Sequence, residues 1–212
     1  MVPTAAECAR AAVKVLGVTG GIGSGKSAAA AILGELGAVV IAADRVGHEC
    51  YLPGTPGWDR VVEAFGRDVV APDGSIDRRR LGTIVFADPV QRSRLEAIVH
   101  PLIRDIIADR VAAERRSARA AAVVIEAALL VEAQWDALVD EVWLITAPRE
   151  VVERRLMVER GLDREAIAQR IGAQLDDAQR TAHADVVVDN SGSLDALRAA
   201  LARLWRERIA RT

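Results

Sequence analysis

The 212-residue sequence has few of the residues that build disulfide-linked or metal-bound folds. It holds two cysteines, Cys8 and Cys50, and three scattered histidines, none at metal-ligand spacing, so neither a disulfide framework nor a zinc site is supported. We expect both thiols to be reduced and structural. No apolar run approaches the ~20 residues that cross a bilayer, and residues 1–12 lack the features of a signal peptide. We therefore expect a cytoplasmic protein with no membrane partner.

The sequence also lacks an excess of charge of either sign. The net charge of −2 gives no general attraction to nucleic acid, so nucleic acid is not an expected partner and any anion site must be local. Aromatic residues make up only 3% of the chain, and its four tryptophans are read as packing residues rather than as a surface for stacking bases. Hydrophobic residues, at 51%, suffice for the core of a single domain over residues 1–212.

What the chain does contain is a phosphate-binding motif. Residues 20–27 read Gly-Gly-Ile-Gly-Ser-Gly-Lys-Ser and match G-x-x-x-x-G-K-[ST] directly after an apolar run. Glycines let successive backbone N–H groups turn around an anion at the start of a helix. We expect Lys26 to reach the β- and γ-phosphates and Ser27 to ligate Mg²⁺. The nucleotide-binding residues predicted here are Gly21, Gly23, Ser24, Gly25, Lys26, Ser27 and Ala28.

The apolar runs predict an α/β architecture. They cover residues 13–19, 38–41, 121–125, 141–146 and 185–188, separated by helix-length segments. Continuous apolarity is typical of strands buried on both faces, so a five-stranded parallel sheet flanked by helices is expected, the P-loop NTPase fold. The carboxyl ends of such strands share one edge. Asp44, Glu126 and Asn190 each follow a strand, so they can converge on the phosphate loop.

Two long intervals interrupt this core, which we place at residues 13–50, 120–147 and 184–212. The first interval, about 51–119, predicts a helical insertion with helices at 58–65, 77–85 and 89–119, the last broken or kinked at His100-Pro101. The second, about 148–182, predicts a two-helix lid with a hinge at Gly161. Its arginines alternate with acids, so each is first read as part of a solvated face. A final helix is expected over 193–211, capped by Ser193.

The phosphate loop belongs to several enzyme classes, and a small-molecule kinase fits best. Neither lysine lies in the N-K-x-D segment of a GTPase, and a motor ATPase would bring further domains. Asp44, at the end of the second strand, is the candidate that accepts the proton of an acceptor hydroxyl; its other reading is the N-cap of the helix from Arg45. Glu126 is read with equal weight as a carboxylate that orders a Mg²⁺-bound water and as a strand-end cap.

Several segments together resemble the dephospho-coenzyme A kinase family. The family's T-G-G-I-G-S-G-K-S is matched by residues 19–27, and its D-A-D by residues 42–44. Its P-G-x-P turn, H-P pair, L-L-x-E segment and A-D-x-V-x-D-N-S-G-S ending are similar to residues 53–56, 100–101, 129–132 and 184–193. The order and spacing of these matches, from about residue 14 to 208, make the resemblance specific.

The resemblance implies transfer of phosphate from ATP to the ribose 3′-hydroxyl of dephospho-coenzyme A, with ATP and Mg²⁺ bound. It implies that Asp44 is the catalytic base, that the insertion holds the coenzyme A moiety, and that Asn190 lies near the adenine. Arg155 and Arg160 are the lid arginines chosen as catalytic.

The chain departs from the family pattern at three positions. Ala42 replaces the first aspartate of D-A-D, Ala128 replaces a proline, and Glu159 stands where the family carries a lid arginine. Arg160 is then one residue out of register, which on a helix is a rotation of about 100°. Either Arg160 lies beyond the end of the helix, or another arginine takes the place of the family's lid arginine.

Two other functions stay open at the level of sequence. One is a kinase of the same architecture for a nucleoside, a nucleoside monophosphate or shikimate. The other is a nucleotide-binding regulatory or scaffold protein without turnover, which Ala42 and Glu159 slightly favour.

Overall fold

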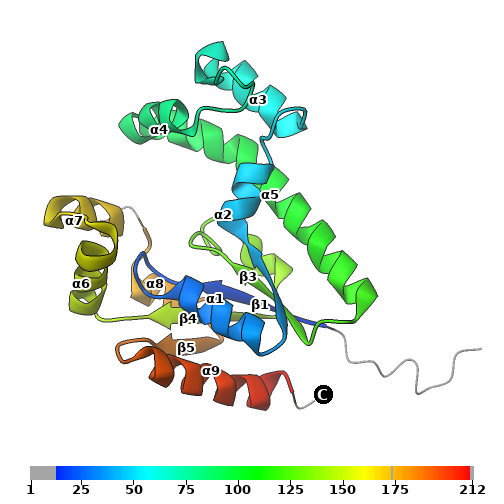
Figure 1. The fold of residues 1–212 in the computed structure, drawn as a ribbon, viewed down its shortest axis with the longest axis vertical. Helices are drawn as coiled ribbons and strands as arrows, with labels where there is room; N and C mark the ends of the chain where they lie inside the picture. The colour runs from blue at the N-terminus through cyan, green and yellow to red at the C-terminus, as the bar shows by residue number, and fades with distance from the viewer. Residues whose placement is uncertain (1–12, 173, 211–212) are drawn as a thin grey trace, which may run out of the picture. The chain divides into compact units, whose positions relative to one another are not determined.

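A five-stranded parallel sheet lies at the centre of the fold. The computed structural model describes residues 13–172 and 174–210, so Cys8 and the interpretation of residues 1–12 lie outside the described part. The strands are β1 (Lys14–Thr19), β2 (Ala38–Ala42), β3 (Ala122–Glu126), β4 (Glu141–Thr146) and β5 (Val186–Asp189). Their order across the sheet is β2-β3-β1-β4-β5, with β1 paired in parallel to both β3 and β4 (Figure 1). The predicted strands are confirmed to within one residue at each end.

The helices connect the strands, and the chain divides into two compact units. They are α1 (Lys26–Glu35), α2 (Ala43–Glu49), α3 (Pro56–Phe65), η1 (Arg67–Val69), α4 (Arg78–Ala87), α5 (Pro89–Ser117), η2 (Trp135–Leu138), α6 (Arg149–Arg160), α7 (Arg164–Gly172), α8 (Asp177–Thr181) and α9 (Leu194–Arg208). Of the described residues, 13–41, 111–172 and 174–210 form one unit, and Ala42–Arg110 form the other. No helix within residues 13–172 and 174–210 is long and apolar enough to cross a bilayer.

The sheet unit buries its main core between the sheet and two helices. Helices α1 and α9 lie along the same face of the sheet (Figure 1), where Leu33 and Leu201 join Trp143 in one apolar cluster. A fully buried leucine contributes about 1.5–3 kcal/mol of stability. On the other face the chain passes close to Gly17, where a Cβ would lie 2.5 Å from Leu130 Cδ2. The phosphate loop begins at the carboxyl end of β1, the middle strand of this packed sheet.

The unit Ala42–Arg110 is helical. The Thr55 hydroxyl accepts a hydrogen bond from Trp58 N at the start of α3, and the Asp77 carboxylate caps α4. Helix α5 begins at Pro89 and continues through Pro101, so of the two forms predicted at His100-Pro101 the break is wrong, while the kink stays a prediction. Burial of Ile103 and Ile107 on the following turns favours continuation of the helix, although the proline removes one hydrogen bond.

Cys50 agrees with its prediction as a reduced structural residue. It is a free, buried cysteine at the end of α2, and its Sγ donates to the Gly47 carbonyl at 3.2 Å. Burial raises the pKa of the thiol to about 11. The thiol is therefore protonated at neutral pH and a poor nucleophile.

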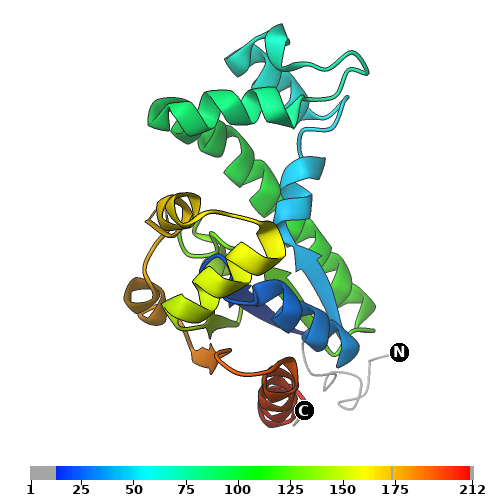
Figure 2. The same cartoon turned by 60° about the vertical axis from the view of Figure 1, so that its left-hand side comes forward.

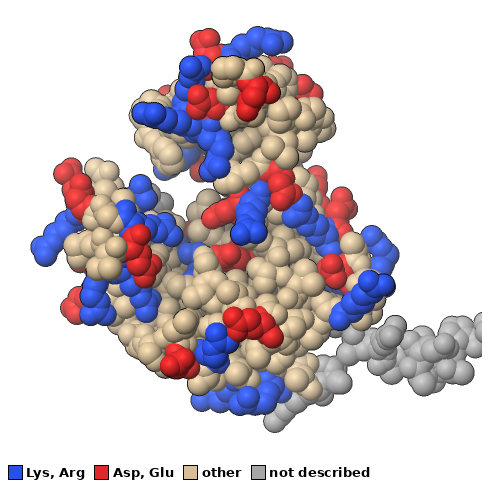
Figure 3. All heavy atoms as spheres, viewed as in Figure 1, with Lys and Arg blue, Asp and Glu red and all other residues tan. Residues whose placement is uncertain are grey.

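The segment after β4 contains three helices rather than the two expected. Helix α6 ends at Gly161, which adopts φ 62° as its C-cap, so the residue ends a helix where the sequence suggested a hinge. Val152 and Leu156 of α6 pack with Ile167 of α7. The two helices lie next to each other (Figure 2), and α8 follows before β5. Both signs of charge appear over α6 and α7 on the face shown in Figure 3, as the alternation of acids and arginines predicts.

Candidate nucleotide-binding site

The phosphate loop runs from the end of β1 to the first turn of α1. Two of its glycines are required by their surroundings. A Cβ on Gly20 would lie 2.2 Å from the Ile145 carbonyl oxygen, and one on Gly25 would lie 2.1 Å from Asn190 Nδ2. Gly25, with φ 99°, is also the N-cap of α1. The loop therefore delivers backbone N–H groups to the start of a helix, where an anion is favoured.

Lys26 and Ser27 occupy the first turn of α1. Lys26 Nζ donates to the Gly21 carbonyl at 2.9 Å, so the tip of the side chain folds back along the loop. The Ser27 hydroxyl donates to Glu126 Oε1, at the end of β3, at 2.6 Å. The predicted convergence of Glu126 on the loop is confirmed by this bond, which joins two oxygen groups of the kind that bind Mg²⁺.

Asn190 holds the loop from the end of β5. Its Nδ2 donates to the Ser24 carbonyl at 2.8 Å, and its backbone N–H donates to the Thr146 carbonyl at 2.7 Å. The side chain is buried, with 6% exposed. Asn190 thus also reaches the loop, and the contact that the structure gives it is with the loop backbone.

Asn190→Ala should lower the free energy of unfolding by about 1–3 kcal/mol, because a buried hydrogen bond is lost and the Ser24 carbonyl loses its donor. Urea denaturation measures the change. Ser191→Ala is the matched control, since that side chain is exposed and its hydroxyl donates to Asp189. Equal stability of the Asn190→Ala and control variants would contradict the role of this bond.

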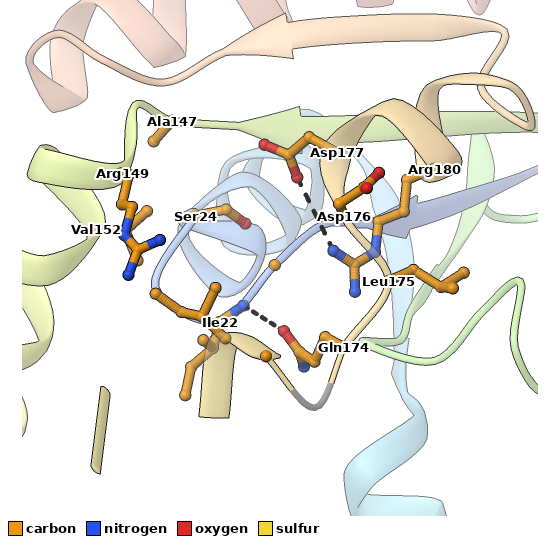
Figure 4. A pocket seen from close by; sticks show the side chains of 13 residues that line it. Ile22, Ser24, Ala147, Arg149, Val152, Gln174, Leu175, Asp176, Asp177 and Arg180 are labelled. Atoms are coloured by element: carbon orange, nitrogen blue, oxygen red, sulfur yellow. Dashed lines mark hydrogen bonds and ion pairs between the residues drawn. The ribbon is translucent and has the colours of Figure 1, made fainter. Parts of the chain in front are cut away.

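Two cavities lie against the phosphate loop. The first, of about 330 Å³, contains most of the residues predicted from sequence. Its lining is Gly23, Gly25, Lys26, Ser27, Ala28, Arg155, Leu156, Glu159, Arg160, Asn190, Leu194 and Leu197. The second, of about 350 Å³, lies at Gly21, Ile22 and Ser24 of the loop and is closed by the segments around α6 and α8 (Figure 4).

The lid arginines chosen from sequence both line the first cavity. Arg155 is partly buried, and its Nη2 donates to the Asn190 carbonyl at 2.9 Å. Arg160 is exposed and is the last residue of α6, so it does not lie beyond the helix end. Glu159 lines the same cavity. Glu159, which stands at the position of the family's lid arginine, and Arg160, one residue further on, thus both lie beside the phosphate loop.

Arg180 is a residue whose position sequence reasoning missed. The alternation of arginines and acids predicts that Arg180 is solvated, yet only 2% of the residue's surface is exposed. Its Nη2 lies 3.3 Å from Glu132 Oε1, and its Nη1 lies 3.9 Å from Asp177 Oδ1. The L-L-x-E segment ending in Glu132 was a sequence signal for an acid at this place, but nothing in the sequence paired it with Arg180.

Asp44 belongs to the unit Ala42–Arg110. It is exposed in the first turn of α2, which begins at Ala43, so the N-cap is Ala42 and the reading of Asp44 as a cap is wrong. His48 follows one turn later. Burial lowers the pKa of His48, as does Arg78, while the Asp44 carboxylate acts to raise it. The Asp44 carboxylate makes no capping hydrogen bond to α2, so contact with a ligand would break none.

Comparison with known proteins gives one consistent result. A family profile described as dephospho-CoA kinase matches residues 14–196. The chain is 47% identical over 194 residues to a dephospho-CoA kinase of Symbiobacterium thermophilum, covering 92% of this chain and 81% of that one. It is 45% identical over 197 residues to one of Geobacter sulfurreducens, covering 93% and 100%.

Solved structures show the same fold. A dephospho-CoA kinase from Campylobacter jejuni superposes with a TM-score of 0.70 at 26% identity, over 92% of this chain and 97% of that one. A shikimate kinase from Acinetobacter baumannii, at 12% identity and a TM-score of 0.55, over 93% and 94%, shares the fold alone. By the profile match and the identity to curated relatives, the chain belongs to the dephospho-CoA kinase family.

Proposed function

We propose that the protein transfers the γ-phosphoryl group of ATP to the ribose 3′-hydroxyl of dephospho-coenzyme A, which gives coenzyme A and ADP in the last step of coenzyme A synthesis. The observation that carries this proposal is the phosphate loop, with Lys26 Nζ at the Gly21 carbonyl, in a chain that the family profile matches over residues 14–196. Binding ATP at a helix N-terminus orients the nucleotide and offsets its charge.

ATP binds along the loop in this proposal. Its phosphates lie against the backbone of residues 20–27, with Lys26 at the β/γ end. Arg155, Arg160 and Asn190 line the adjoining cavity. In this proposal the two arginines contribute positive charge and Asn190 lies near the adenine. Helices α6 and α7, within the segment 148–182, act as a lid that excludes water from the transferred group.

The acceptor is held by the insertion. Residues 51–119 bind the coenzyme A moiety, and the Asp44 carboxylate accepts the proton of the ribose hydroxyl as that oxygen attacks the γ-phosphorus. A cytoplasmic location belongs to the same proposal, because it would bring the enzyme together with both substrates.

Mg²⁺ is the proposed metal partner of ATP. The donors at hand fit it, because the Ser27 hydroxyl and the Glu126 carboxylate are hard oxygen groups 2.6 Å apart at the end of β3. Ser27 would ligate the ion, and Glu126 would hold it through a water. When bound, the ion neutralises charge on the phosphate oxygens.

Glu126→Gln should raise the Mg²⁺ concentration needed for half-maximal activity by about 10–100-fold, since a charged outer-shell group is lost while an amide oxygen can still accept from Ser27. Titration of Mg²⁺ in the kinase assay measures the shift. Glu35→Gln, an exposed glutamate on α1 paired with Arg198, is the control. An unchanged Mg²⁺ requirement would leave Glu126 as a residue that only fixes Ser27.

The direct test is product formation. Purified protein is incubated with ATP, Mg²⁺ and dephospho-coenzyme A, and coenzyme A is detected by mass spectrometry beside a Lys26→Ala control. Phosphorylation of a nucleoside, a nucleoside monophosphate or shikimate at equal or higher kcat/KM would favour another kinase. ATP binding without transfer to any of these acceptors would favour a regulatory protein.

A further inference from the structure

Arg180 is a buried charge that the proposed roles above do not use. Its exposed fraction is 2%, and burying an arginine is costly unless its donors are paired. Glu132 accepts from Nη2 at 3.3 Å, whereas Asp177 lies 3.9 Å from Nη1, beyond hydrogen-bond distance. Nε is buried and has no hydrogen-bond partner among the described residues. The guanidinium therefore has donors that the protein itself leaves unsatisfied.

The guanidinium of Arg180 faces the phosphate loop at Gly21. A Cβ placed on Gly21 would lie 3.6 Å from Arg180 Nη1. Figure 4 shows the side chain directed from α8 toward this part of the loop, on the same side as Gln174, whose Oε1 accepts from Ile22 N at 2.9 Å. Arg180 and Gln174 thus approach the loop from the same segment of the chain and at the same end.

That end of the loop is where the γ-phosphate is expected. The motif lysine reaches the β- and γ-phosphates, and Lys26 Nζ lies 2.9 Å from the Gly21 carbonyl. Arg155 is directed at the other end of the loop, since its Nη1 would lie 3.9 Å from a Cβ on Gly25. The two arginines therefore flank the phosphate loop, with Arg180 beside Gly21 and Arg155 beside Gly25.

We infer that Arg180 is a catalytic residue that donates hydrogen bonds to the γ-phosphoryl group of ATP as it is transferred. The inference rests on the proposed function only in that ATP must bind this loop. Glu132 holds the guanidinium in place through Nη2, which leaves Nε and Nη1 for phosphate oxygens. A guanidinium suits this task because it presents several N–H groups in one plane and keeps its charge.

Arg180 neither transfers a proton nor forms a covalent bond in the reaction. The bond between the γ-phosphorus and the oxygen that bridges it to the β-phosphate breaks, and its electron pair leaves with ADP. The acceptor oxygen forms the new bond to phosphorus, and its proton goes to the base. Arg180 stays protonated throughout and acts on the charge spread over the three γ-oxygens.

Arg180→Ala should lower kcat by about 10³-fold or more, the effect known for arginines that contact a transferred phosphoryl group. The KM for ATP should change much less, because most ground-state contacts of the nucleotide are with the loop. Guanidinium chloride, at a concentration that leaves the wild type folded, should restore part of the activity of Arg180→Ala and none of that of Lys26→Ala. Arg170→Ala is the control, since Arg170 is an exposed arginine of α7.

A purely structural role is separated by changing Glu132. Glu132→Gln keeps the shape of the side chain and removes its charge, and the double variant Arg180→Ala/Glu132→Gln leaves no unpaired charge behind. Glu132→Gln should keep kcat within about 10-fold, whereas the double variant should unfold at a temperature close to that of the wild type and still lack turnover. If the double variant recovers turnover, or if Arg180→Ala loses less than 10-fold in kcat, the inference is overturned.

Acceptor-free hydrolysis of ATP distinguishes this inference from the proposed function. Wild-type protein that makes no coenzyme A would refute the proposed acceptor. A slow ATP hydrolysis that falls in Arg180→Ala but not in Arg170→Ala would then still support contact between Arg180 and the γ-phosphoryl group. Equal hydrolysis by the two variants would refute it.

Discussion

Lys26→Ala should lower kcat for coenzyme A formation by about 10³-fold or more, equivalent to a loss of ~4 kcal/mol of transition-state stabilisation. The ammonium group is the charge that the motif brings to the β/γ-phosphates, and Nζ already lies at the Gly21 carbonyl. As negative charge moves toward the β-phosphate oxygens during transfer, the interaction strengthens, so kcat falls more than ATP affinity. A coupled assay for ADP and mass spectrometry of the product measure the loss.

The chain offers its own control for this prediction. Lys14 is the other of its two lysines and pairs with Glu141 at 2.6 Å, at the start of β1. Lys14→Ala should cost stability through that ion pair and leave kcat near the wild-type value. Suppose that Lys14→Ala has the kcat of the wild type and that Lys26→Ala also keeps kcat within tenfold of it. The loop would then not act on the transferred phosphate.

The fold could be predicted because its determinants are local in sequence. Each strand is a continuous apolar run, as in Val142-Trp143-Leu144-Ile145, and the phosphate loop is one unbroken motif. Ser193 caps α9 as expected from its type and place. The bonds of Glu126 and Asn190 to the loop follow from a rule of parallel sheets, since Glu126 ends β3 and Asn190 directly follows β5.

The rest of the site depends on contacts between segments far apart in sequence. Arg180 is buried beside Glu132, which lies 48 residues earlier, whereas its local pattern is that of a solvated helix face. Gln174 reaches Ile22 from 152 residues away. A local signal did exist for α8, because Asp176 and Gln179 form a capping box, but such a box predicts a helix start and not the burial of the arginine that follows.

Asp44→Asn should lower kcat by about 10²–10⁴-fold, the range typical of a lost general base. The amide keeps the size of the side chain and cannot accept the proton of the ribose hydroxyl. In the structure Asp44 is exposed on the first turn of α2, with the N-cap role taken by Ala42, so the substitution removes no capping bond. Steady-state kinetics with dephospho-coenzyme A measure the effect, and KM for ATP should stay near the wild-type value.

A loss of helix stability is the competing explanation, because a carboxylate in the first turn also interacts favourably with the helix dipole. Asp195 occupies the second position of α9, as Asp44 does in α2, and is exposed. Asp195→Asn therefore removes a carboxylate from a helix dipole without removing the proposed base. NMR titration of His48 adds a local readout: since Asp44 acts to raise the pKa of His48, that pKa should fall further in Asp44→Asn. A shifted His48 together with wild-type kcat would mean that the charge was removed from an intact α2 and that catalysis does not need it. A shifted His48 with kcat lost, and Asp195→Asn fully active, would make Asp44 the base.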